Sequence, residues 1–251
     1  MKNIMLTVAY DGSGYHGFAF QENIETVEGE IKKAVDLLTG VDTEIIGASR
    51  TDAGVHAYGN VVVFATESTI PPGRFAPALN NKLPEDIRIM KSEEVPLDFH
   101  PRKRLSEKTY EYHILNVKTM IPTKRKYTCH NSYPLDENRM NEAAQYLIGE
   151  YDFTSFCAAG SQAISHTRRI IGAGVIRHGD EITIRVTGNG FLYNMVRIIA
   201  GTLMEIGRGK GEPSDIIQII EAKDRSTAGP TAPPQGLYLM NYRFFEEEKD
   251  H

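Results

Sequence analysis

The sequence has little cysteine and no long apolar run, and each absence excludes a class of protein. Its only cysteines are Cys129 and Cys157, too few for a disulfide framework or a zinc site. No apolar stretch approaches the roughly 18 residues that a membrane-spanning helix needs, and the first residues lack the pattern of a secretory signal peptide. We therefore expect a protein of the reducing cytoplasm without a membrane segment.

A P-loop for a nucleotide and a regular metal-binding motif are also missing. No GxxxxGK loop is present to bind a nucleotide phosphate. The histidines of predicted loops have no cysteine partners, whereas metal sites have regular ligand spacings. These histidines are His16, His56, His100 and His166. We expect neither an organic cofactor nor a metal ion.

The net charge of −5 argues against a nucleic-acid partner, because proteins that bind nucleic acids are usually basic. Basic residues nevertheless gather in short clusters, and a basic cleft can attract RNA even on an acidic protein. The alternative is that each cluster is an ordinary solvated surface. The clusters are Arg102-Lys103-Arg104, Lys124-Arg125-Lys126 and Arg168-Arg169.

Hydrophobic patterns of strand and helix period divide the chain into two halves. The first half predicts the order β-α-β-β-α-β, which is the pattern of a ferredoxin-like unit. Thr26 is expected to cap the first helix and Gly40 to end it, and the second helix runs from Pro71 toward Leu83. The predicted strands are 3–10, 44–47, 60–66 and 86–93.

The second half has a similar composition of elements. Helices are predicted after Asp136, from Phe191 to Ile206 and from Pro213 to Ala222, and strands at 107–116, 170–177, 181–187 and 237–245. We predict an α+β fold in which two ferredoxin-like halves share one continuous mixed, mainly antiparallel sheet with a central cleft. The halves are residues 1–104, which carry Asp52, and residues 105–251.

The stretch Gly47–Ala57, GASRTDAGVHA, has the composition of a functional loop. Its glycines allow a tight turn and the close approach of a ligand. Asp52 lies near its centre, and a carboxylate on a loop held by a strand is a candidate nucleophile, base or metal ligand. The alternative is that Thr51 or Asp52 caps a turn.

Two further residues are unusual in their setting. Tyr110 belongs to the predicted strand 107–116, where a tyrosine usually buries its ring in the core. Arg197 falls in an otherwise apolar predicted helix, so its charge either needs a partner or extends to solvent.

The string GASRTDAGVHA resembles the active-site signature of the tRNA pseudouridine synthase A family. Other segments resemble that family in the same order: YDGSGYHG, DFHPR, YDFTSF, FLYNMVRIIAGTLMEIG and AKDRSTAGPTAPPQGLYL. One segment departs from it, because Phe18-Ala19-Phe20-Gln21 stands where the family usually carries Trp-Gln-Arg-Gln. A basic RNA contact is therefore missing at Phe20, while the candidate catalytic positions match.

The resemblance implies an enzyme that isomerises uridine to pseudouridine at positions 38, 39 and 40 of the tRNA anticodon stem-loop. It implies a homodimer that binds tRNA and uses neither a metal ion nor an organic cofactor. Asp52 would be the nucleophile, attacking C6 of the base or C1′ of the ribose, and Arg197 would face its carboxylate. Tyr110 would stack on the flipped uracil, and Arg50 would fill the space that the base leaves.

The expected site follows from these considerations. Asp52, Tyr110 and Arg197 are expected to be catalytic. Substrate binding is assigned to Arg50, His56, Arg102, Tyr110, Lys124, Arg125, Arg168 and Arg169. Two other functions stay open on the residues alone. One is an RNA-binding protein without catalysis, and the other is a hydrolase, although enzymes that hydrolyse glycosidic bonds generally use two carboxylates.

Overall fold

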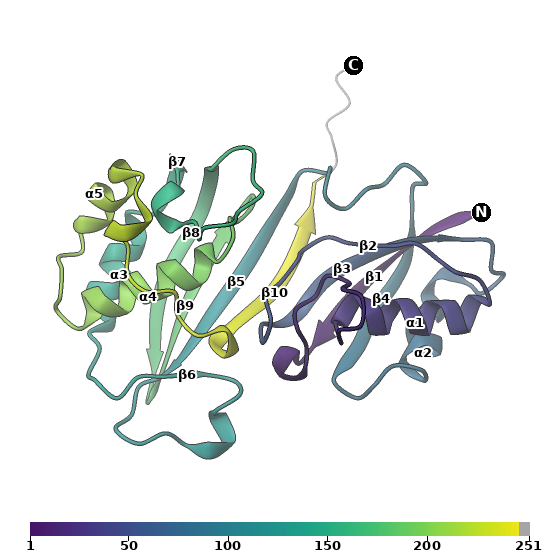
Figure 1. Cartoon of the computed structure of the whole chain (residues 1–251), viewed down its shortest axis with the longest axis horizontal. Coiled ribbons are helices and arrows are strands. Elements are labelled where there is room, and N and C mark those ends of the chain that lie inside the picture. The colour runs from purple at the N-terminus through teal and green to yellow at the C-terminus, as the bar shows by residue number, and fades with distance from the viewer. Residues whose placement is uncertain (246–251) are drawn as a thin grey trace. The chain divides into compact units, whose positions relative to one another are not determined.

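Two units make up the computed structural model, which describes residues 1–245 (Figure 1). Unit 1 combines Met1–Ser106 with the chain from Leu239 onward, and unit 2 is Glu107–Tyr238. Strands β5 (Ser106–Leu115) and β10 (Leu237–Phe244) each begin in one unit and continue in the other. The division predicted at residues 104 and 105 differs in its treatment of the last strand, most of which groups with unit 1.

Unit 1 is built on a mainly antiparallel sheet with the strand order β4-β1-β3-β10. β1 (Lys2–Tyr10) lies between β3 (His56–Thr66) and β4 (Ile87–Val95) and pairs antiparallel with both. The short strand β2 (Ile45–Gly47) pairs antiparallel with β3. This arrangement places the ends of β1, β2 and β3 around the predicted Asp52 loop.

Helix α1 (Val27–Thr39) is defined at both ends by residues that the sequence identifies. Thr26 caps the first turn, because its side-chain oxygen accepts the N–H of Gly29 at 3.2 Å. Gly40 ends the helix with a φ of 77°, in the left-handed region. The buried side carries apolar residues at helical spacing, such as Ile31 and Val35, which are fully buried. The predicted helix is confirmed.

Helix α2 (Phe75–Asn80) is shorter than the predicted segment, because a 3-10 turn at Pro72–Arg74 comes before it. The helix contacts α1 and packs on β4. Its Phe75 ring meets the Phe64 ring of β3 edge to face, with the centroids 5.5 Å apart. These contacts fix α2 on the sheet beside α1 (Figure 1).

In unit 2 the strands of the sheet follow one another in the order β5-β9-β8-β7, and they are mainly antiparallel. β9 (Glu181–Gly188) pairs antiparallel with β5 and with β8 (Thr167–His178). β7 (Gly149–Asp152) pairs antiparallel with β8, and the short β6 (Cys129–His130) pairs with β5 in parallel. The mainly antiparallel sheet and the helices confirm the predicted α+β class.

The helices of unit 2 are α3 (Glu137–Gln145), α4 (Met195–Gly207) and α5 (Asp215–Ala222). α3 packs on β8 and on α4. Asp136 caps α3 as predicted, because its carboxylate accepts the backbone N–H groups of Asn138 and Arg139. α4 is apolar along most of its length and is buried accordingly.

The starts of α4 and β3 each differ from their predicted positions by four residues. The helix predicted from Phe191 begins at Met195, because Asn194 has a φ of 59°, in the left-handed region that a right-handed helix does not contain. The strand predicted from Asn60 begins at His56, because its pairing with β1 extends to the partners Tyr10 and Ala57. His56 is therefore part of a strand and not of a loop.

The 3-10 turn Gly12–Gly14 follows β1 and packs against the chain at Val55. A Cβ atom on Gly12 would lie 2.0 Å from the carbonyl oxygen of Val55, whereas one on Gly14 would meet nothing within 4 Å. Gly12, Gly14 and Gly17 have the spacing of a GxGxxG motif, but the next helix begins only at Val27. Their arrangement therefore serves loop packing and not a dinucleotide phosphate, which needs a helix start at this point.

Gly12→Ala should destabilise the protein, because the turn or Val55 must move to admit the methyl group. We expect the free energy of unfolding to fall by about 1–3 kcal/mol, the usual range for overpacking. Gly14→Ala is the matched control from the same turn and should change that free energy by less than about 0.5 kcal/mol. Urea unfolding of both variants makes the comparison, and equal midpoints would contradict the close packing at Gly12.

Candidate active site

The loop of residues 48–55, here called the Asp52 loop, connects β2 to β3. The two strands pair antiparallel, so both ends of the loop are fixed. Arg50 is exposed on this loop, whereas Asp52 is partly buried. The loop therefore presents an arginine to solvent and holds a carboxylate two residues further along the chain.

The segment 12–18 holds the Asp52 loop through backbone groups. The N–H of Phe18 donates to the carbonyl of Thr51 at 3.0 Å, and the N–H of Gly54 donates to the carbonyl of Tyr15 at 3.4 Å. The N–H of Val55 donates to the carbonyl of Asp52 at 3.1 Å and closes a tight turn. Backbone contacts on both sides of Asp52 thus restrict the position of its carboxylate.

His56, which the sequence assigns to substrate binding, is only 2% exposed at the start of β3. Its Nδ1 accepts the N–H of Gly12 at 3.2 Å and lies 3.2 Å from Oδ1 of Asp11. The ring therefore joins the turn after β1 to the end of the Asp52 loop. Its contact with the substrate stays a prediction.

Glu28, in the first turn of α1, is a buried anchor that sequence reasoning missed. It is 9% exposed, and its Oε1 accepts the N–H of Gly47 at 3.2 Å while its Oε2 accepts the N–H of Phe20 at 2.8 Å. An acid near a helix N-terminus is favourable for local reasons alone, so no sequence signal distinguished it. Its carboxylate fixes the end of β2 directly before the Asp52 loop.

The segment that departs from the family pattern contains two different kinds of residue. Phe18 is fully buried, and its ring fills the space over Gly47, where a Cβ atom would lie 2.1 Å from its Cε1. It also lies beside the ring of Tyr10, with the centroids 5.9 Å apart. Phe20, by contrast, is 59% exposed. The departure therefore places one aromatic ring in the core and one on the surface.

Arg102 reaches the same region of unit 1. Its Nε donates to the carbonyl oxygen of Gly47 at 2.7 Å. This bond places its positive charge at the start of the Asp52 loop. Unit 1 therefore brings together four of the predicted site residues: Arg50, Asp52, His56 and Arg102.

Arg197 lies in the first turn of α4, where two protein groups orient its guanidinium. Its Nε donates to the carbonyl of Ala232 at 2.7 Å, and its Nη1 donates to Oδ1 of Asn194, also at 2.7 Å. The N–H of Ala232 donates in return to the carbonyl of Arg197 at 3.0 Å. Sequence reasoning missed Asn194. Its backbone lies in the left-handed region, which asparagine tolerates better than most residues do.

The segment 228–236, here called the strap, lies close against α4 and supports this arrangement. A Cβ atom on Gly201 would lie 1.8 Å from the carbonyl oxygen of Pro230. The N–H of Gly229 donates to Oγ1 of Thr202 at 2.9 Å. These contacts hold the strap on the helix, and the strap in turn supplies the Ala232 carbonyl to Arg197.

Tyr110 on β5 is 8% exposed. Its ring meets that of Phe191 edge to face, with the centroids 5.2 Å apart. Phe191 comes shortly before α4, so Tyr110 and Arg197 are both linked to the segment 191–197 of unit 2. This burial fits a core residue as well as a stacking platform, and the stacking role stays a prediction.

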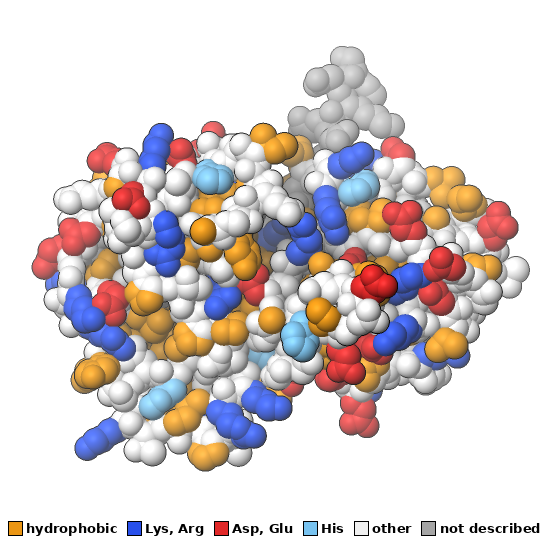
Figure 2. Space-filling model, viewed as in Figure 1, with side chains coloured by type: hydrophobic (Ala, Val, Ile, Leu, Met, Phe, Trp, Pro, Cys, Tyr) orange, Lys and Arg blue, Asp and Glu red, His pale blue; other side chains and the backbone are white. Residues whose placement is uncertain are grey.

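The predicted basic contacts of unit 2 differ in their surroundings. Nη1 of Arg168 donates to the carbonyls of Ser165 and Thr167 at 2.9 and 2.7 Å, and burial lowers the pKa of the guanidinium. Arg169 is exposed on β8. Lys124 forms an ion pair with Glu181, and Arg125 donates to the carbonyl of Pro122. On the face shown in Figure 2, Lys and Arg side chains lie along the extended segment that includes β6.

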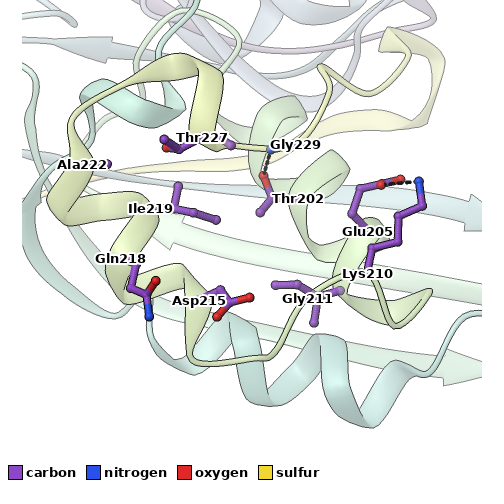
Figure 3. A pocket seen from close by; sticks show the side chains of 12 residues that line it. Thr202, Glu205, Lys210, Gly211, Asp215, Gln218, Ile219, Ala222, Thr227 and Gly229 are labelled. Atoms are coloured by element: carbon purple, nitrogen blue, oxygen red, sulfur yellow. Dashed lines mark hydrogen bonds and ion pairs between the residues drawn. The ribbon is translucent and has the colours of Figure 1, made fainter.

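A cavity of about 680 Å³ lies in unit 2 between α4 and α5 (Figure 3). Several of its polar groups are already paired within the protein. Lys210 contacts Glu205 at 2.6 Å, and Oδ2 of Asp215 accepts the N–H of Glu212 at 2.8 Å. None of the predicted site residues lines this cavity. The candidate site is therefore at the Asp52 loop and not here.

Within residues 1–245, no group of three or more His, Cys, Asp or Glu side chains is arranged to hold a metal ion. The helices in this part of the chain include none with the length and apolar character needed to span a membrane.

Comparison with known proteins identifies the family. The profile of the family described as tRNA pseudouridine synthase matches residues 6–102 and 143–244. The first matched segment contains Asp52, and the second contains Arg197. Tyr110, Lys124 and Arg125 lie between the two segments.

Three relatives named tRNA pseudouridine synthase A are similar to almost the whole chain. The relative from Caldicellulosiruptor bescii is 48% identical and covers 96% of this chain and 99% of its own length. The relative from Syntrophomonas wolfei is 47% identical and covers 99% of this chain and 100% of its own length. The relative from Ruminiclostridium cellulolyticum is 49% identical and covers 96% of this chain and 98% of its own length. The chain therefore belongs to the tRNA pseudouridine synthase family, a family of enzymes that isomerise uridine in tRNA.

Proposed function

We propose that this enzyme converts uridine to pseudouridine at positions 38, 39 and 40 of the tRNA anticodon stem-loop. The observation that carries the proposal is the Asp52 loop, which holds a partly buried carboxylate between backbone hydrogen bonds on both sides. A carboxylate held in this way suits a nucleophile that must meet a flipped base in one orientation.

Asp52 is the proposed nucleophile. Its carboxylate adds either to C6 of the uracil or to C1′ of the ribose, both of which are electrophilic. The N1–C1′ glycosidic bond breaks, the base turns, and C5 bonds to C1′. C5 then loses its proton. The bond from Asp52 breaks either when C5 attacks C1′ or when the adduct at C6 is eliminated, so that the carboxylate is released. Tyr110 is the proposed residue that helps to remove this proton, directly or through a water molecule.

A uracil stacked in a stem is out of reach of Asp52, so the base must leave the stem at a cost of a few kcal/mol. Arg50, which is exposed on the Asp52 loop, is proposed to take the place of the base. Tyr110 is proposed to stack on the extruded uracil, and such stacking contributes roughly 1–3 kcal/mol per base.

Arg197 is proposed to pair with Asp52 and so to keep its carboxylate ionised. The support is that Asn194 and Ala232 orient the guanidinium through two hydrogen bonds of 2.7 Å. A charge oriented in advance needs no rearrangement to meet an anion. We also propose that the enzyme is a cytoplasmic homodimer that works without a metal ion or an organic cofactor.

Asp52→Asn tests the proposed function. The variant should form no pseudouridine in a tRNA transcript labelled at uridine, because an amide does not replace the carboxylate as a nucleophile, and its Kd for tRNA should be nearly unchanged. Asp42→Asn makes the same change at a side chain of unit 1 that is 92% exposed, and it should keep full activity.

Transcripts that carry uridine at only one of positions 38, 39 and 40 show which positions react. No reaction at any of the three, with reaction elsewhere in the tRNA, would contradict the proposed target. Product formed by Asp52→Asn at near the wild-type rate would remove Asp52 from the nucleophile role.

A double-variant cycle tests the proposed pairing of Arg197 with Asp52. Removing one member of a buried ion pair costs about 3–5 kcal/mol, so Arg197→Met should lose both activity and stability. Asp52→Asn should lose less stability, because its amide oxygen still accepts a hydrogen bond. The double variant should be less destabilised than the two losses added together. Additive shifts in the melting temperatures of the variants would show that the two residues are not coupled.

Salt dependence tests the basic residues that are proposed to bind tRNA. Each phosphate contact contributes about 0.7–0.9 to the slope of log affinity against log salt concentration. Arg169→Ala should therefore flatten the slope, whereas Lys124→Ala should do less, because Lys124 already forms an ion pair with Glu181. An unchanged slope for Arg169→Ala would mark it as an ordinary surface residue. The other residues of this proposed group are His56, Arg102, Arg125 and Arg168.

A further inference from the structure

We propose that the side chains of Tyr10, Thr51 and Asn60 form a positioning chain, which sets the direction in which the Asp52 loop leaves β2. The inference rests on the proposed role of Asp52 as nucleophile. The three side chains are polar and are buried in unit 1, with exposed fractions of 5%, 8% and 0%. None of them takes part in the proposed reaction, so their burial in an apolar sheet requires a reason.

Asn60 extends the pairing of β2 with β3 by one residue. The last backbone bond of this pairing runs from the N–H of Ala48 to the carbonyl of Val61, at 2.7 Å. At Ser49 the side chain of Asn60 takes the place of the β3 backbone as the pairing partner. Its Nδ2 donates to the carbonyl of Ser49 at 2.9 Å, and its Oδ1 accepts the N–H of Ser49 at 3.3 Å. An amide side chain can do this because it carries a donor and an acceptor, as a peptide group does.

The pairing of Ser49 with a side chain instead of with the β3 backbone explains where the Asp52 loop begins. The backbone groups of Ser49 are paired with the Asn60 side chain, so they need no partner in the backbone of β3. The loop can therefore turn away from β3 at Arg50 while the N–H and the carbonyl of Ser49 both stay paired. Asn60 therefore fixes the residue at which the Asp52 loop leaves the sheet.

Tyr10 connects this point to the residue next to Asp52. Nδ2 of Asn60 also donates to the Tyr10 hydroxyl at 3.2 Å, and that hydroxyl shares a hydrogen bond of 2.7 Å with Oγ1 of Thr51. The carbonyl of Thr51 accepts the N–H of Phe18 at 3.0 Å. Thr51 is thus held through its side chain and through its backbone, and Asp52 starts from a fixed point.

The three residues act through Asp52 and not on the substrate. If one hydroxyl of the Tyr10–Thr51 bond is removed, the other loses that partner in a buried setting, which favours a shift of Thr51. A displacement of about 1 Å in a reacting group can lower a rate on the order of 10²-fold. The loss should therefore appear in the chemical step, while tRNA binding is retained.

The test measures single-turnover rates at saturating tRNA, and tRNA Kd values, for Thr51→Val, Tyr10→Phe and the double variant. Each single variant should be slower by about 10- to 100-fold, with a nearly unchanged Kd. The double variant should be no slower than the slower single variant, because both changes remove the same bond. Thr51→Ser keeps the hydroxyl and should recover most of the rate.

Thr43→Val is the matched control. Thr43 is also buried in unit 1, at 4% exposed, and its hydroxyl donates to the carbonyl of Val41 at 3.2 Å. The change removes a comparable hydrogen bond before β2 instead of in the Asp52 loop. It should lower the melting temperature by an amount similar to Thr51→Val and leave the single-turnover rate unchanged.

Wild-type rates for Thr51→Val and Tyr10→Phe, beside an inactive Asp52→Asn, would overturn the positioning chain and leave the proposed function standing. Full activity of Asp52→Asn would overturn the proposed function and the positioning chain with it. If Thr51→Val does not fold, Tyr10→Phe decides the question, because it keeps the buried ring. Equal losses of rate in Thr51→Ser and Thr51→Val would also overturn the inference, since the hydroxyl would then have no part in it.

Discussion

The close approach of the turn after β1 to the loop after β2 is the contact on which the candidate site depends. Gly12 has no room for a side chain beside the carbonyl of Val55. His56 and Thr51 both accept backbone N–H groups from this turn and the residues that follow it. Hydrogen bonds weaken steeply when they are bent, so several of them together leave the loop few conformations. The Asp52 carboxylate therefore owes much of its position to the surrounding backbone.

The same kind of control acts on Arg197 in unit 2. A backbone carbonyl and a side-chain amide oxygen orient its guanidinium, and the strap that supplies the carbonyl can approach α4 because Gly201 has no side chain. Both of these groups are neutral, and they fix the direction of the guanidinium. A charge prepared in this way can act on an anionic group without prior rearrangement.

Elements set by local signals could be predicted from the sequence. Thr26 and Gly40 bound α1 because capping acts within a few residues, and β1 begins one residue before its predicted start. The start of α4 could not be predicted, because the apolar pattern continues back to Phe191 while the backbone turns at Asn194, whose side chain binds Arg197. The start of β3 likewise depends on its pairing with β1, a partner that is remote in the sequence.

Glu28 and Asn60, which sequence reasoning missed, each bind a partner in another part of the fold. Glu28 resembles any acid at a helix start, and Asn60 resembles any polar residue at the edge of an apolar strand. A short motif can identify the reactive group, because the chemistry depends on what that group is. Its placement depends on buried polar atoms that each need a partner, and here those partners come from β1, α1 and β3. A chain that kept the motif but lost Glu28 or Asn60 would keep Asp52 without its fixed position.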